Sequence, residues 1–69
     1  MKETLAMVDA PGPRGFCAGI VLWDDTVVEA APVVRYMAKK HWSRAQVRRY
    51  CADRGWKVFV VHELQRARP

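Results

Sequence analysis

No apolar run in this sequence approaches the roughly 18 residues that a membrane-spanning helix needs. The first residues include Glu3, and the apolar core of a signal peptide does not follow them. Glycine and proline are scarce, at four each, while 51% of the residues are apolar, which argues against a disordered chain. These absences predict one small globular domain, residues 1–69, in the cytoplasm and without a membrane partner.

Cysteine is also scarce. Cys17 and Cys51 lie 34 positions apart, and in a reducing compartment both are expected to be buried, small apolar side chains. A disulfide between them is the main alternative. His41 and His62 could in principle complete a zinc site, but neither pair has the close spacing of zinc-binding motifs. The sequence therefore predicts neither a metal nor a cofactor.

Turn residues and apolar runs divide the chain into segments. Residues 1–15 are expected to form a lead segment and a turn, with at most a short strand at 4–8. The apolar run at 16–23 and the β-branched run at 26–30 predict a hairpin around Asp24 and Asp25. A basic tail is expected at 65–69.

Helical signals follow the hairpin. Pro32 suits the first turn of a helix at 32–40, Ser43 is a credible N-cap of a second helix at 43–54, and Gly55 would end it. A last strand is expected at 56–63. The predicted fold class is α+β: a small antiparallel or mixed sheet of three to four strands, with two helices on one face.

Both faces of the expected sheet are apolar. In the last strand, Val58, Val60 and Leu64 are expected on one face, with Phe59 and Val61 on the other. Two helices can cover only one face, so the other needs the lead segment, a second copy of the chain or a partner. A homodimer or a protein partner is favoured, since a domain of this size buries only about 60% of its unfolded surface.

The tryptophans are expected to differ in role. Trp42 and Trp56 flank the second helix and should clamp it to the sheet, whereas Trp23, beside the acidic turn, should be exposed. On the second helix, Val47, Tyr50 and Cys51 fall on one side and are expected to face the core.

Charge divides the chain into two halves. Residues 1–34 carry five acidic and two basic residues, a net charge of −3, whereas residues 35–69 carry ten basic and two acidic residues, a net charge of +8. A surface with this bias attracts acidic protein faces or polyanions. The predicted partner-binding residues lie on the two helices: Arg35, Tyr36, Lys39, Lys40, Arg44, Arg48 and Arg49.

Three segments resemble small uncharacterised proteins carried by bacteriophages and prophages. They are FCAGIV at 16–21, VVEAAPVVRYM at 27–37 and GWKV at 55–58, so that the resemblance covers about residues 16–60. It implies a phage accessory protein in a bacterial host cell. Such proteins often bind and block a host machine, as anti-CRISPR proteins do. The resemblance supplies no catalytic residue.

The leading functional hypothesis is therefore a stoichiometric inhibitor or adaptor that binds a host protein or ribonucleoprotein complex. The alternative is a direct DNA- or RNA-binding module. Against a helix-turn-helix, the connection at 40–42 is bulky and lacks the usual glycine. An enzyme is not expected, because no histidine has an evident nucleophile partner and Gly12 and Gly15 lack the Lys-Ser/Thr of a phosphate loop.

Overall fold

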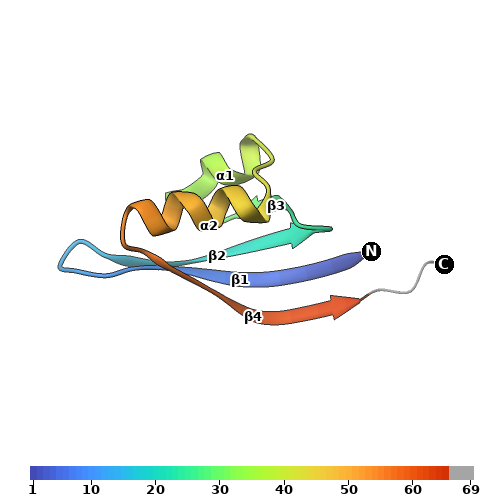
Figure 1. The fold of residues 1–69 in the computed structure, drawn as a ribbon, viewed down its shortest axis with the longest axis horizontal. Coiled ribbons are helices and arrows are strands. Elements are labelled where there is room, and N and C mark those ends of the chain that lie inside the picture. Colours follow the sequence, from blue (N-terminus) through green and yellow to red (C-terminus); the bar gives the residue numbers. More distant parts are fainter. Residues whose placement is uncertain (66–69) are drawn as a thin grey trace.

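The computed structural model describes residues 1–65, which form a four-stranded sheet with two helices on one face (Figure 1). The elements in chain order are β1 (Lys2–Ala10), β2 (Phe16–Trp23), β3 (Thr26–Ala30), the 3-10 turn η1 (Pro32–Val34), α1 (Arg35–Lys39), α2 (Arg44–Asp53) and β4 (Lys57–Gln65). The strand order is β3-β2-β1-β4, and every neighbouring pair is antiparallel. The predicted α+β class is confirmed. The predicted order along the chain, a hairpin followed by two helices and a strand, is confirmed as well.

The lead segment is the main correction. Residues 2–10 form a nine-residue central strand, not a lead with a short strand at 4–8. β1 pairs with β2 on one side and β4 on the other. Thr4, Ala6, Val8 and Ala10 alternate toward the helices and are buried. Alanine occupies two of these four positions, and its low strand propensity weakens the strand pattern in the sequence.

The hairpin turn is confirmed at Asp24 and Asp25. Both have positive φ, 49° and 65°, as the central residues of a type I′ turn require. Aspartate tolerates this conformation better than most residues because its short side chain bonds locally. Here the Asp24 carboxylate accepts a hydrogen bond of 2.9 Å from the Lys2 backbone N–H, which ties the turn to β1.

The ends of α2 follow the expected signals. The Ser43 hydroxyl oxygen accepts from the Gln46 N–H at 3.1 Å, and the Gln46 side chain accepts from the Ser43 N–H at 3.4 Å. This reciprocal pair is a capping box. Gly55 follows the helix with φ 73°, a conformation that glycine adopts without cost. The first predicted helix, 32–40, begins instead as η1 and becomes α-helical only at Arg35.

The core lies between the helices and the helix-covered face of the sheet, called here the helix face. Ile20 and Leu22 of β2, Met37 of α1, and Val47 and Cys51 of α2 are each at most 2% exposed. Tyr50 is half-buried beside them, so the predicted core side of α2 is confirmed. Trp42 and Trp56 pack against this core, whereas Trp23 is 47% exposed, also as predicted.

A β-bulge corrects the predicted faces of β4. Ala6 pairs with Val60 but Leu5 pairs with His62, so Val61 is an additional residue in β4. The bulge reverses the alternation beyond it. Leu64 pairs with Glu3 and therefore lies on the face opposite to Val60, not on the same face as expected.

The second face of the sheet, called here the open face, is uncovered by residues 1–65. Leu5, Trp23, Phe59 and Leu64 lie on it and are each 39–49% exposed. The lead segment cannot cover this face because it is itself a strand of the sheet. The expected homodimer through this face stays a prediction.

Replacing a core residue should destabilise the fold strongly. Ile20 is 1% exposed at the centre of β2, and Ile20→Ala should lower the free energy of unfolding by about 2–5 kcal/mol, because it leaves a cavity. Val33 is 51% exposed, and Val33→Ala should change it by less than about 0.5 kcal/mol. Urea unfolding followed by tryptophan fluorescence measures both. Equal losses in the two variants would contradict this assignment of the core.

Candidate functional site: the basic helices and the groove beside them

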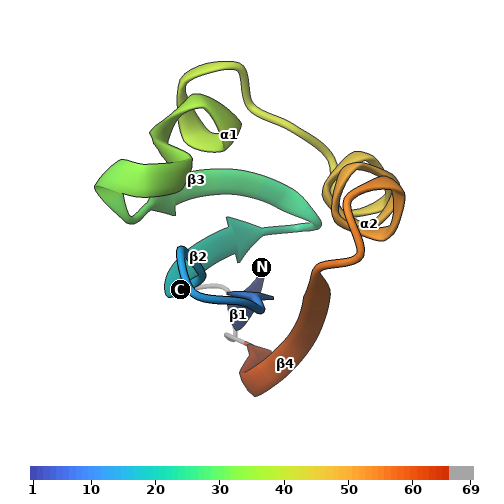
Figure 2. The same cartoon turned by 90° about the vertical axis from the view of Figure 1, so that its left-hand side faces the viewer.

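The predicted partner-binding residues lie on α1, on its C-terminal end and on α2, and so belong to one layer of the molecule. The fold thus brings the two basic segments to the same side of the sheet, as Figure 2 shows. Five of the side chains are exposed to solvent: Arg35, Lys39, Lys40, Arg48 and Arg49. Tyr36 and Arg44 are partly buried, and both make specific contacts inside the molecule.

Tyr36 joins the two helices. Its hydroxyl donates a hydrogen bond of 3.1 Å to the Tyr50 hydroxyl, and its ring meets Trp42 edge-on at 5.4 Å between centroids. Burial raises the pKa of Tyr36 to about 12. The contacts continue from Tyr50 to Trp56, whose ring centroids are 5.7 Å apart. In the free chain, Tyr36 therefore contributes to the packing of α1 against α2.

Arg44 belongs to a cluster of four charged side chains, called here the ion cluster. Its Nη1 lies 3.3 Å from Asp25 Oδ1 and 3.5 Å from Glu63 Oε1. Lys2 Nζ approaches the same two oxygens at 3.0 and 3.5 Å. The cluster links β1, the hairpin turn, the start of α2 and the end of β4. The ion cluster cannot be predicted from the sequence, because its members are up to 61 positions apart.

Hydrogen bonding sets the acidities in the ion cluster. The Lys2 ammonium, which donates to Asp25, lowers the pKa of that carboxyl. The Thr4 hydroxyl donates to Glu63 Oε1 at 3.2 Å and, with Lys2 and Arg44, lowers the pKa of Glu63. Both carboxylates are 40–50% exposed, so salt weakens these interactions.

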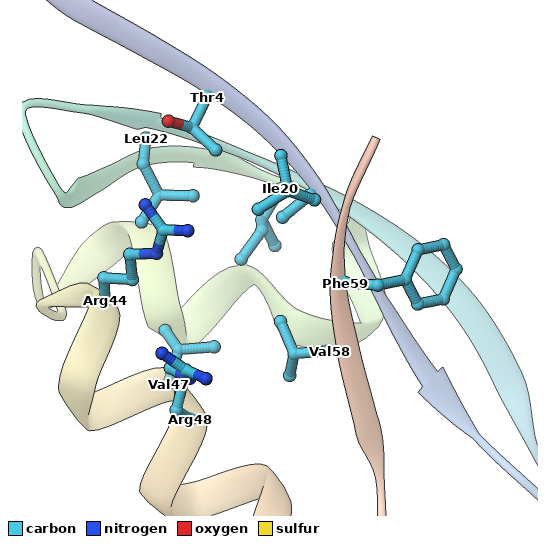
Figure 3. A pocket seen from close by; sticks show the side chains of 10 residues that line it. Thr4, Ile20, Leu22, Arg44, Val47, Arg48, Val58 and Phe59 are labelled. Carbon is cyan, nitrogen blue, oxygen red and sulfur yellow. The ribbon is translucent and has the colours of Figure 1, made fainter. Parts of the chain in front are cut away.

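An open groove of about 220 Å³ lies between α2 and β4 (Figure 3). Its floor is apolar and comes from β1 and β2, chiefly Ala6, Ile20 and Leu22. Val47 of α2 lines one side, and Val58 and Val60 of β4 line the other. The groove exists because β4 diverges from α2 along its length, as Figure 2 shows. Val60 consequently stays 42% exposed although it lies on the helix face.

Two arginines stand on the α2 side of this groove. Arg44 and Arg48 lie one helical turn apart, and both line it (Figure 3). Arg44 is held by the ion cluster, whereas Arg48 is exposed and makes no ion pair within residues 1–65. The site therefore combines an apolar floor with a guanidinium that can bind a carboxylate or phosphate. The arginines could be predicted from the sequence, but the groove could not.

The cysteines differ in environment. Cys51 is buried in the core, which raises the pKa of its thiol. Cys17 is exposed and not buried as expected, because it lies on the open face opposite Asp9. The two thiols are not bonded to each other.

Within residues 1–65, no three histidine, cysteine or acidic side chains gather closely enough to hold a metal ion. No helix in this range has the length and apolar character needed to cross a membrane. No family model, curated protein or solved structure matches the chain.

The ion cluster should make stability depend on pH in the acid range. Because the folded-state pKa of Glu63 is lowered from its ordinary value of 4.5, its contribution is present above that pH and is lost as the pH falls through the lowered value. The free energy of unfolding should therefore fall on acidification, and Glu63→Gln should make the fall smaller.

Glu29 provides the control, since it is exposed and lies outside the ion cluster. Glu29→Gln should leave the acid dependence close to that of the unmodified chain. Urea unfolding at a series of pH values, repeated at high salt, measures the effect, and high salt should reduce the difference. An acid dependence unchanged by Glu63→Gln would show that the cluster does not stabilise the fold.

Proposed function

We propose that this chain is a small binding protein that acts stoichiometrically on an acidic surface of another protein. The observation that supports this most directly is Arg48, an exposed guanidinium beside an apolar groove, with no ion pair inside residues 1–65. Arg35, Lys39, Lys40 and Arg49 extend the positive charge across the same layer. A carboxylate from a partner would pair with the guanidinium that residues 1–65 leave without an ion pair.

The apolar floor of the groove favours a protein over a nucleic acid as the partner. Contacts to a phosphate backbone need positive charge but no apolar cavity. Protein interfaces typically combine a few arginines and apolar anchors, which together supply most of the binding energy. The groove and Arg48 offer this combination, because Arg48 lies at the edge of the apolar floor.

The resemblance to phage-borne accessory proteins suggests that the partner is a molecule of the bacterial host cell. The acidic surface would belong to a host protein or ribonucleoprotein complex, and the basic helices would cover it. Inhibition would then follow from occupancy alone. Arg44 is removed from the expected contact set, because it already holds two carboxylates of its own chain.

Reversing one charge should separate binding from folding. Arg48→Glu should weaken the complex by about tenfold or more, since one charge-assisted hydrogen bond contributes about 1.5–3 kcal/mol. Arg14→Glu makes the same change of charge in the exposed turn between β1 and β2 and should bind like the unmodified chain. The complex is first captured from nuclease-treated bacterial lysate, and the affinity of the purified partner is then measured by calorimetry.

Duplex DNA provides the competing arm of this test. A nucleic-acid-binding module should bind it tightly, with log affinity falling linearly with log salt at a slope of roughly −0.9 per neutralised phosphate. Tight duplex binding that Arg48→Glu weakens, without any protein partner, would overturn the proposal. Equal partner affinity in Arg48→Glu and Arg14→Glu would also overturn it.

A further inference from the structure

The two edges of the sheet differ in how far the chain covers them. Beside β3, the connection between the helices forms backbone bonds: the Val27 N–H donates to the Trp42 carbonyl at 2.9 Å, and Thr26 bridges Ser43. β4 forms the other edge, and within residues 1–65 no strand pairs with its outer side. It is nine residues long and mostly exposed. An uncovered strand of this length can pair with another extended chain.

The central part of β4 lacks the usual protection of an edge strand. Residues 58–61 are all apolar, and the charged Lys57 and Glu63 lie outside this run. Proline and lysine within a strand commonly prevent edge pairing, and this run contains neither. The bulge at Val61 is the protective feature that does occur, and it limits which strand can pair here.

A second copy of β4 is a poor occupant of this edge. Antiparallel pairing of two copies about Val60 would set Lys57 opposite Glu63. Directly opposite residues must share a face, yet Lys57 pairs with Asp9 on the open face and Glu63 pairs with Thr4 on the helix face. The bulge thus prevents the two copies from matching along this length. A shorter, unrelated strand avoids the conflict.

The groove indicates which side chains an added strand should have. An added strand beside β4 would turn every second side chain toward α2, over the exposed Val60 and the groove of about 220 Å³. This volume exceeds the ~150 Å³ cavity that accepts a benzene-sized group, so one large apolar side chain can enter. The next side chain on that face, two residues along, could reach the rim where Arg48 is exposed.

We infer that β4 accepts an extended acidic segment of a partner protein as a fifth strand. One apolar side chain of the segment occupies the groove between α2 and β4, and a carboxylate two residues away binds Arg48. The inference rests on the proposed function, since it specifies the form in which the acidic partner binds.

A designed peptide and two variants test the inference. In the peptide, leucine and glutamate alternate at every second position, with threonine between them. Val60→Trp should fill the groove and weaken peptide binding by about tenfold or more. Val60 is 42% exposed, so its replacement should not disturb the core. Val33→Trp adds the same bulk at a residue 51% exposed on η1, away from the groove, and should bind normally.

Methylation of the peptide backbone gives a test that leaves the protein unchanged. In an added strand, alternate N–H groups face β4. Methylating one alternate set of amide nitrogens should therefore abolish binding, and methylating the other set should not. Fluorescence anisotropy of the labelled peptide measures both, and circular dichroism confirms that each protein variant is folded.

The outcomes separate this inference from the proposed function. Absent peptide binding, equal binding of the two methylated peptides, or full affinity in Val60→Trp would overturn strand addition. If Arg48→Glu still weakens partner binding in that case, the proposed function stands, and only binding by strand addition is wrong. Concentration-dependent dimerisation that Val60→Trp removes, without peptide binding, would instead assign this edge to a second copy.

Discussion

The rest of the fold depends on the pairing of β1 with both β2 and β4. β1 forms the middle of the sheet, and its buried Thr4, Ala6, Val8 and Ala10 supply the floor on which the helices pack. Met37 of α1 and Val47 of α2 belong to the same buried core. Thr4 and Ala6 of β1 also line the groove between α2 and β4. The core and the candidate site therefore share residues of this strand.

Local chemistry made much of the fold predictable. The hairpin at residues 16–30, the Ser43 cap and the stop at Gly55 each follow from side chains a few positions apart. β1 is longer than the sequence predicts, because Ala6 and Ala10 have low strand propensity and give little strand signal. The bulge at Val61 could not be predicted, because it is a property of the pairing with β1 and not of the β4 sequence.

The candidate site shows the same division. The positive charge of the helices could be predicted, because charge follows directly from composition. The sequence does not predict which arginines are free to bind a partner, because the carboxylates that pair with Arg44 come from the hairpin turn and from β4. The groove was also hidden from the sequence, since four separate elements line it. Tyr36 packs against the aromatic residues between the helices, and its predicted role in partner binding stays a prediction.

The strand order has a consequence for how the chain is made. Among the four strands of the sheet, β1 is synthesised before the others, but one of its two neighbours, β4, is synthesised after them. Contacts between such distant segments form slowly, because a long loop must close first. Until residues 57–65 emerge, the middle strand has one unpaired edge beside an incomplete core. Synthesis thus passes through a period in which this edge of β1 can pair with a wrong strand.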